Sequence, residues 1–407
     1  MDDTVDWSNL PVELWPLIGE KLKLRIESLR FRSVCHSWRS CLPRFHPSLP
    51  PKFPLPSSNG PTSFLSQNTV YLLQSPSTSS RAAPSSSGGW LVKVEECDRM
   101  LLRNPITSRR IRYSKDSSTL SPECFNLLEF KMIELGKSYF LRFIRGSGSV
   151  DVLKKVILMP PEIVDCAILV ICDKGNLGFA KSGDEKLTKF SNIGGFVFDD
   201  VFVYKGQPYV VDSLGCVFRI DVSSKVMVKI SSELVGLGGR KHLVESCGEL
   251  YVVDRYFDQE QNKQEATGLE LDFSFWGFRR RGRYRRYHSG ELKVVDFKVY
   301  KLELLDGELG RWVEVESLGG QAFFLAIDCS FSVSAEELAG CEGNCIYFSD
   351  ENDVNLALRE VTRPESFVFN LEDHSIQKLG SSPGGSGSQI YWPPPIELGS
   401  PCSYSLD

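Results

Sequence analysis

The sequence of 407 residues contains no long hydrophobic run. No apolar stretch approaches the roughly 18 to 20 residues that a membrane-spanning helix needs. The acidic start, MDDTVDWS, also lacks the basic-then-apolar order of a signal peptide. We therefore expect a soluble protein that acts in the nucleus, the cytoplasm or both, without a membrane partner.

The usual signatures of catalysis and metal binding are also missing. There are five histidines, and none has a second histidine at the HxxxH spacing of a metal site. No P-loop is present, and no GxGxxG motif opens a helix. The one GxSxG match, at 380–384, contains Pro383 and precedes a Gly/Ser run, so Ser382 lacks the strand-turn-helix context of a nucleophile. We expect no cofactor, no metal, no catalytic residue and no enzymatic activity.

The twelve cysteines do not form a disulfide framework. Many lie inside apolar runs such as DCAILVICD at 165–173, which is typical of free thiols in a reducing compartment. The closest pair, Cys341 and Cys345, has no second Cys/His pair nearby that would complete four zinc ligands. The cysteines therefore agree with an intracellular location.

The first forty-odd residues have a helical pattern that the rest of the chain lacks. Pro11 suits a first helical turn, whereas Pro16 would bend or delay a helix and Gly19 is a poor helix former. We predict three short helices with breaks near 23–25 and 34–35. Such a short segment cannot bury its own apolar face, so a separate protein, or alternatively the chain's own sheets, must cover it. The apolar residues at helical spacing are Leu10, Leu14, Ile18, Leu22, Leu29, Val34 and Trp38.

Composition divides the remainder into segments. Residues 47–88 are nearly half Pro and Ser, which is a linker composition, although 64–74 has the β-propensity of a strand. From 89 to 380, short β runs alternate with Gly, Asp and Asn turns. The tail, 381–407, is poor in core-forming residues. The chain is therefore predicted to be mainly β, with a small helical start.

Self-similarity within the β region predicts a propeller. KGQPYVVD at 205–212 and CGELYVVD at 247–254 place their tyrosines 42 residues apart, and EGNCIYFSD at 342–350 is a looser third copy. This spacing matches the period of β-propeller blades, although YVVD is also a common buried strand. The length available predicts six or seven blades. Because propellers often close by pairing strands from both ends, the strand at 64–74 is a candidate latch for the final blade.

An arginine-rich stretch, FWGFRRRGRYRRYHSG at 275–290, interrupts the β pattern within an insertion at 257–290. Arginines among aromatic residues suit an acidic or phosphorylated partner, a nuclear-import signal or single-stranded nucleic acid. A solvated insertion whose arginines balance upstream acidic residues is an equally good interpretation. The net charge of -5 makes nucleic acid the weakest of these. The six arginines are Arg279, Arg280, Arg281, Arg283, Arg285 and Arg286.

These features together resemble a known family. The helical start resembles an F-box, whose pattern begins with Leu10 and Pro11 and ends in Val34, Cys35 and Trp38 of a Val-Cys-x-x-Trp element. The remainder resembles plant F-box proteins with a KIB-type, kelch-like β-propeller, in blocks such as HLVESCGELYVVD and GCEGNCIYFSDEND. The resemblance implies a three-helix F-box in residues 1–46 followed by a six- or seven-bladed propeller in residues 89–380.

The resemblance also implies a function. An F-box binds the Skp adaptor of a Skp-cullin-F-box (SCF) ubiquitin ligase, and through it cullin, while the propeller binds an unidentified protein that is to be ubiquitinated. Such a chain is a non-catalytic substrate receptor. The residues implied to bind the adaptor are Leu10, Pro11, Leu14, Ile18, Leu22, Leu29, Val34 and Trp38.

Two other classes of function stay open at this point. One is a nuclear or RNA-associated propeller scaffold that uses the arginine-rich insertion. The other is a propeller enzyme whose carboxylates line a channel. Accepting hydrogen bonds from turns at the strand ends is the simpler role for these carboxylates. The carboxylates concerned are Asp199, Asp200, Asp212 and Asp254.

Overall fold

Contacts within the computed structural model divide the chain into two modules. The helical module comprises residues 1–50 and 123–129, and the strand module comprises residues 51–122 and 130–407. The structure describes residues 10–22, 25–42, 51–55, 60–74, 88–96, 101–111, 131–144, 153–160, 163–164, 166–172, 175–190, 196–234, 236, 238–258, 293–303, 309–349, 365–379 and 390–391.

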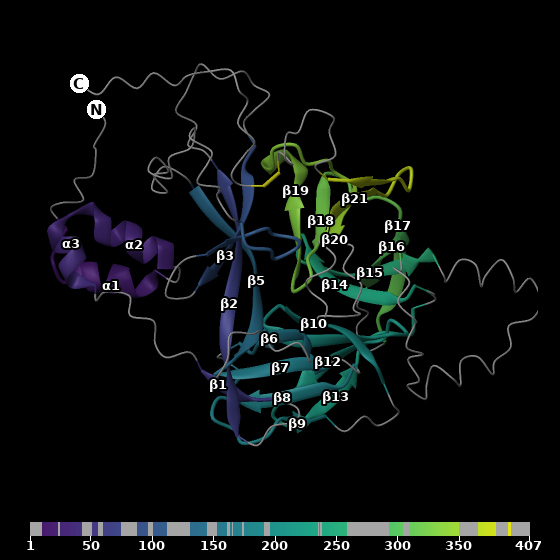
Figure 1. Cartoon of the computed structure of the whole chain (residues 1–407), viewed down its shortest axis with the longest axis horizontal. Coiled ribbons are helices and arrows are strands. Elements are labelled where there is room, and N and C mark those ends of the chain that lie inside the picture. Colours follow the sequence, from purple (N-terminus) through teal and green to yellow (C-terminus); the bar gives the residue numbers. More distant parts are fainter. Residues whose placement is uncertain are drawn as a thin grey trace, which may run out of the picture. The chain divides into compact units, whose positions relative to one another are not determined.

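The helical module contains three short helices, as predicted: α1 (Leu14–Lys21), α2 (Arg25–Val34) and α3 (His36–Cys41) (Figure 1). Its interior is aromatic. Trp15 and Phe31 are buried, and the half-buried Trp38 lies 4.4 Å from Phe31 and 6.3 Å from Trp15 between ring centroids. In the described part of the chain, no helix has the length and apolar character needed to cross a membrane.

The Val-Cys-x-x-Trp element starts α3 and fixes it against α2. Cys35 has an extended backbone at the N-cap of α3, and its Sγ accepts a hydrogen bond from the amide of Trp38 at 3.5 Å. This bond satisfies one of the amides that the first helical turn leaves without a partner. At the other end of α3, the Arg32 side chain donates to the carbonyls of Arg39, at 3.0 Å, and Leu42. Both ends of α3 are thus capped by residues that precede it in the sequence, Cys35 at its start and Arg32 at its end.

The structure accommodates both suspected helix breakers. Pro16 is the third residue of α1, within the first turn, where its missing N–H costs no intrahelical bond. Pro11 precedes α1 rather than starting it, and its carbonyl accepts a bond from the Leu14 amide at 3.0 Å. Gly19 is buried, and a Cβ there would overlap the side chain of Leu42. Gly19 therefore permits the close packing of the segment after α3 on α1.

The packing at Gly19 can be tested by Gly19→Ala. In an exposed helix this change stabilises by about 1 kcal/mol, but here the new methyl group would displace Leu42, so we expect the opposite sign. Hydrogen exchange of residues 14–42 in the full chain should become faster. Ser37→Ala, at an exposed site of α3, is the control and should leave exchange unchanged or slow it. Slower exchange in Gly19→Ala would refute the packing role.

The strand module contains four hydrogen-bonded sheets among its described residues. The first holds β1 (Lys52–Pro54), β2 (Pro61–Gln74), β3 (Trp90–Glu96), β4 (Leu101–Arg103), β5 (Lys131–Phe143), β6 (Leu153–Leu158), β7 (Ala167–Cys172), β8 (Leu177–Lys181) and β9 (Thr188–Lys189). The second holds β10 (Phe198–Tyr204), β11 (Gln207–Asp212), β12 (Val217–Asp221) and β13 (Val226–Lys229). The third holds β14 (Arg240–Ser246), β15 (Glu249–Phe257), β16 (Val294–Glu303) and β17 (Arg311–Val315). The fourth holds β18 (Gln321–Leu325), β19 (Ser330–Ser334), β20 (Cys345–Ser349), β21 (Ser366–Asn370) and β22 (Ile376–Lys378).

These sheets form a closed ring. The first sheet is two four-stranded blades, β5-β2-β3-β4 and β6-β7-β8-β9, joined through the pair Tyr139 and Val156. One edge strand of each blade contacts the next: β6 packs on β10, β10 on β14, β14 on β19, and β19 on β5, which pairs with β6. We call β5, β6, β10, β14 and β19 the inner strands. A series of contacts that returns to its start is the arrangement of a propeller.

The described strands supply five blades, fewer than the six or seven predicted from length. The prediction assumed that strands fill the whole of residues 89–380 at a constant repeat. Residues 259–292, between β15 and β16, and 350–364, between β20 and β21, lie outside the described residues. The length of the connections, and not only of the blades, therefore enters the count.

The strand predicted at 64–74 is present as part of β2, but its partners differ from those of a latch. β2 pairs with β3 on one edge and with β5 on the other, and its start also pairs with β1. It therefore belongs inside the first blade, and the strand module begins at Pro51 rather than at residue 89. Contact with the C-terminal part is made instead by Leu91 of β3, which bridges to Tyr391.

Two of the three repeat copies occupy equivalent positions. The YVVD segments lie in β11 and β15, each the second strand of its blade. The preceding turns, Lys205-Gly206 and Cys247-Gly248, have positive φ at both residues (47° and 72°, 51° and 78°), as a tight hairpin requires. The third copy differs, because β20 pairs in parallel with β18. The repeat therefore reflects a shared hairpin in adjacent blades.

Candidate functional site

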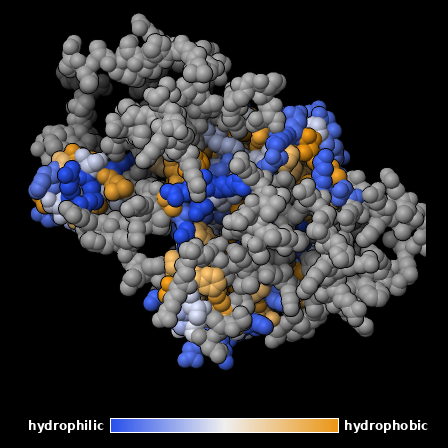
Figure 2. Space-filling view, viewed as in Figure 1, coloured by the Kyte–Doolittle hydropathy of each residue, from blue (hydrophilic) through white to orange (hydrophobic). Residues whose placement is uncertain are grey.

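The helical module exposes an unusual share of large apolar side chains. Of the eleven such side chains that are exposed in the described residues, five lie in this short segment. They are Val12, Leu14, Leu17, Leu29 and Val34, between 41% and 61% exposed. Figure 2 shows apolar residues among hydrophilic ones on the surface of this module. We call these five residues the apolar surface of the helical module.

The predicted adaptor-binding residues divide into two groups. Pro11, Leu14, Leu29 and Val34 are exposed, whereas Leu10, Ile18, Leu22 and Trp38 are half-buried. Val12 and Leu17 are exposed apolar residues that the sequence reasoning missed. Leu17 could have been found, because it lies three residues after Leu14 and so on the same side of α1. Adaptor binding by these residues stays a prediction.

The six arginines of the insertion, Arg279, Arg280, Arg281, Arg283, Arg285 and Arg286, lie outside the described residues, as does Ser382.

Asp212 performs the strand-end role that we expected. Its Oδ1 accepts hydrogen bonds from the amides of Leu214 and Cys216 at 2.9 and 2.8 Å. Burial raises the pKa of its carboxyl to about 6, against the lowering effect of these two bonds. The perturbed pKa therefore has a structural cause in a buried turn.

The other three carboxylates hold neighbouring strands rather than strand-end turns. Asp254 forms an ion pair with Lys241 at 2.5 Å, with both side chains fully buried. Asp199 accepts from the amide of Lys241, and Asp200 accepts from that of Leu243 and pairs with Lys155. The strand-end prediction was wrong for them because it considered only the local sequence. Their partners lie on neighbouring strands, so each of these carboxylates joins one strand to the next.

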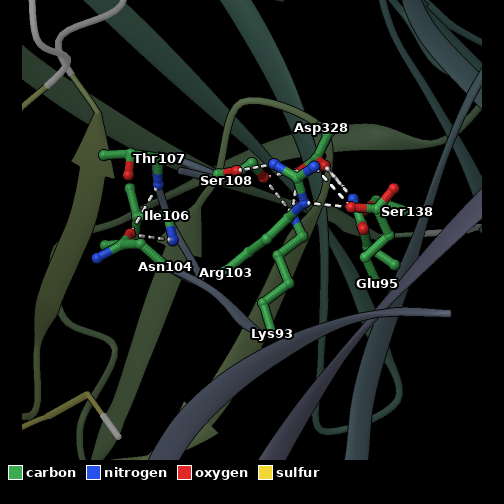
Figure 3. A network of polar contacts seen from close by, with 10 residues as sticks. Lys93, Glu95, Arg103, Asn104, Ile106, Thr107, Ser108, Ser138 and Asp328 are labelled. Carbon is green, nitrogen blue, oxygen red and sulfur yellow. Dashed lines mark hydrogen bonds and ion pairs between the residues drawn. The ribbon is translucent and has the colours of Figure 1, made fainter. Parts of the chain in front are cut away.

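A larger polar network joins the first and last blades (Figure 3). Asp328, between β18 and β19, pairs with the fully buried Lys93 of β3 at 2.5 Å. Its Oδ2 also accepts from Ser138 at 2.9 Å, from Ser108 at 3.1 Å and from Asn68 at 3.4 Å. Burial alone would raise the pKa of Asp328, but Lys93 and the serine hydroxyls outweigh it and hold the pKa below its ordinary value. One carboxylate thus gathers donors that lie 190 to 260 residues away in the sequence.

The turn that carries Ser108 is itself held by polar bonds. Asn104 Oδ1 accepts from the amides of Ile106 and Thr107 at 3.0 and 2.9 Å. Arg103 donates to Ser108 O at 2.7 Å and to the buried carboxylate of Glu95 at 2.6 and 2.8 Å. Ser108 and Lys93 also form a 2.5 Å hydrogen bond. Lys93, Ser108 and Asp328 thus bond to one another, which gives the network a structural role.

No other chemistry-bearing cluster stands out in the described residues. They contain no group of three or more His, Cys, Asp or Glu side chains that could hold a metal ion. His242 of β14 is buried, and its pKa lies well below the ordinary value because of burial and the nearby Arg240 and Arg255. It therefore stays neutral in the folded protein.

Removing one partner of the closing ion pair tests its role. Asp328→Asn leaves the buried Lys93 charge uncompensated, which we expect to lower the free energy of unfolding by about 3 kcal/mol. Urea denaturation of the full chain measures the change. Glu314→Gln is the control, since Glu314 pairs with Lys298 in an exposed position, where a loss below about 1 kcal/mol is expected. Equal losses in the two variants would contradict the importance of the network.

Asp212 should make stability depend on pH. Its pKa of about 6 in the folded protein exceeds the ordinary 3.8, so the folded state holds the proton more tightly. Stability contributed by Asp212 is present below pH 3.8 and falls as the pH rises to about 6. Asp212→Asn keeps the acceptor Oδ1 but cannot ionise, so between pH 4 and 7 wild type should lose about 2 kcal/mol relative to this variant. Urea denaturation of both proteins at pH 4 and at pH 7 measures this change. The same difference in the free energy of unfolding between wild type and variant at both pH values would contradict the prediction.

A closed ring of mainly antiparallel blades together with a module of three short helices defines a β-propeller protein with a helical N-terminal module. The KIB1-4 beta-propeller family model matches residues 61–370, so the chain belongs to this family. The relative named "Putative F-box protein At1g65770" from Arabidopsis thaliana is 31% identical over 360 residues, which cover 86% of this chain and 91% of that one. The F-box protein SKIP23 from the same plant is 28% identical over 412 residues, 96% of this chain and 95% of that one. The resemblance to plant F-box proteins with a KIB-type propeller is thereby confirmed, as is the mainly β propeller fold.

Proposed function

We propose that this protein is the substrate-recognition subunit of an SCF ubiquitin ligase, acting in the nucleus, the cytoplasm or both. In this role the helical module binds a Skp-type adaptor, which connects it to cullin, and the propeller binds the protein to be ubiquitinated. The observation that carries the proposal is the apolar surface of the helical module. The relatives align with nearly the whole chain and are named as F-box proteins, which supports the proposal.

The number and the position of the exposed apolar residues suit binding to a protein partner. Leu14 and Leu17 are three residues apart in α1 and therefore neighbours on one side of the helix. Val12 and Pro11 continue the exposed segment just before it. A fully buried large apolar side chain contributes about 1.5 to 3 kcal/mol. Covering five that are about half exposed would contribute on the order of 5 kcal/mol before the costs of association.

The mechanism in this role is positioning. A receptor that holds its substrate beside a charged ubiquitin-conjugating enzyme raises the effective concentration of the substrate lysine. This chain then needs no nucleophile. Burial raises the pKa of the thiols of Cys216, Cys329 and Cys345 to about 12, which is opposite to the low pKa of a reactive cysteine. These buried thiols support a receptor that leaves the thioester chemistry to other subunits.

The double substitution Leu14→Asp/Leu17→Asp tests adaptor binding. Both side chains are exposed, so the fold should survive, while two carboxylates in an apolar interface should weaken binding at least about 100-fold. The dissociation constant of the full chain with a purified Skp adaptor, measured by biolayer interferometry, gives the result.

The matched control is Val226→Asp/Val228→Asp on β13. These valines are 50% and 40% exposed, close to the values of 42% and 55% for Leu14 and Leu17, but they lie in the strand module. The control should bind the adaptor like wild type. If wild type and the helical variant bound with the same affinity, or if neither bound, the proposed function would have to be abandoned.

A further inference from the structure

A cavity of about 320 Å³ lies where inner strands of the ring converge. Four of the five inner strands contribute to its lining: Leu135 comes from β5, Phe202 from β10, Glu245 and Ser246 from β14, and residues 330–334 from β19. These residues come together only because the ring closes. The cavity is therefore a product of the whole fold and not of one blade, and we call it the central cavity.

The polar lining of the central cavity is rich in hydrogen-bond acceptors and carries negative charge. The half-buried Glu245 and the exposed Glu337 are among its lining residues, and no lysine or arginine is among its described lining residues. The hydroxyls of Ser246 and Ser332 lie 2.9 Å apart, and Ser332 donates to Gln321 Oε1 at 3.2 Å. These bonds connect β14 to β19 and leave further oxygen lone pairs for a ligand that donates hydrogen bonds.

The remaining wall of the cavity is apolar. Leu135, Phe202 and Val333 provide aliphatic and aromatic surface beside the acceptors. A ligand that matches both parts has a long hydrocarbon stem and a cationic, donor-rich head. Arginine combines a three-carbon stem with a planar guanidinium that carries five N–H donors and packs well on aromatic faces.

Cations near the cavity do not cancel its charge. Lys155, whose Nζ lies 6.0 Å from the ring centroid of Phe202, is already paired with Asp200. Lys205 is fully exposed, and a hydrogen bond with Tyr204, followed by the charges of Glu249 and Glu245, raises its pKa. Because water and salt screen an exposed charge, Lys205 offsets the negative charge of Glu245 only in part.

We propose that the central cavity binds an arginine side chain of the substrate protein. This inference rests on the proposed function for the identity of the bound protein, and it gives the substrate a chemical property: an exposed segment with an arginine that can enter the ring. Glu245 and Glu337 select the charge, the hydroxyl and amide oxygens accept the guanidinium N–H groups, and the apolar wall packs on the stem.

The test uses the full-length protein and two labelled peptides. One has a single central arginine in an otherwise Gly/Ser sequence, and the other has glutamine in its place. Fluorescence anisotropy at low ionic strength should show binding at least tenfold tighter for the arginine peptide. Glu245→Gln/Glu337→Gln should remove this preference, while Glu314→Gln, an exposed glutamate on β17, should keep it.

Thermal unfolding of each variant shows whether it folds. If the double variant does not, Ser334→Trp, which fills the cavity without changing its charge, replaces it and should also weaken arginine-peptide binding at least tenfold. Equal affinity of wild type for the two peptides, or an arginine preference that survives in the folded variant, would overturn the inference.

Adaptor binding by the same samples separates this inference from the proposed function. If the adaptor binds and wild type does not prefer the arginine peptide, only the inference about the cavity is wrong. If the preference holds and the adaptor does not bind, the cavity recognises arginine in a protein that is not an adaptor-linked receptor, and the arginine site itself stands.

Discussion

The carboxylate of Asp328 holds together parts of the chain that are remote in sequence. Lys93, Ser108 and Ser138 all donate to it, and together they belong to the first blade, whereas Asp328 belongs to the last. A buried ion pair contributes little net stability compared with an apolar replacement, but breaking it by removing one partner is costly. Its main effect is therefore to specify which two blades meet. The central cavity depends on the same closure, because its lining is drawn from four inner strands.

The two modules bury their apolar side chains to different extents. The ring buries its apolar residues between blades, as with Val210 and Val253, which are fully buried. The helical module has only a small aromatic centre, formed by Trp15, Phe31 and Trp38, and five of its described large apolar side chains are exposed. A segment of this size cannot do otherwise without help. This difference is the physical reason that the proposed function assigns adaptor binding to the helices.

Features determined by local sequence could be predicted. The helix breaks follow from spacing, and the tight turns before the YVVD strands follow from Gly206 and Gly248. Family and fold class were also accessible, because the Val-Cys-x-x-Trp element and the hairpin repeats are local patterns. Cys35 and Trp38 show why such an element is specific: one caps α3 and the other packs on α2.

Features determined by long-range contacts could not be predicted. Asp254 looks like a strand-end aspartate until Lys241 is placed beside it, and the strand at 64–74 looks like a latch until both of its edges are paired. The network around Asp328 leaves no sequence signal, because its donors are two serines, an asparagine and a lysine between residues 68 and 138, 190 to 260 residues from Asp328. Trp15 and Phe31 were missed as the centre of the helical module because leucines dominate its periodic pattern.

In the proposed function, the helical module alone binds the adaptor. Hydrogen exchange of the full chain, measured with and without a purified Skp adaptor, tests this division most directly. Slower exchange in residues 10–22 and 25–42, with unchanged exchange in β2 through β22, is the predicted result. Slower exchange confined to the strand module, with none in the helices, would contradict the account.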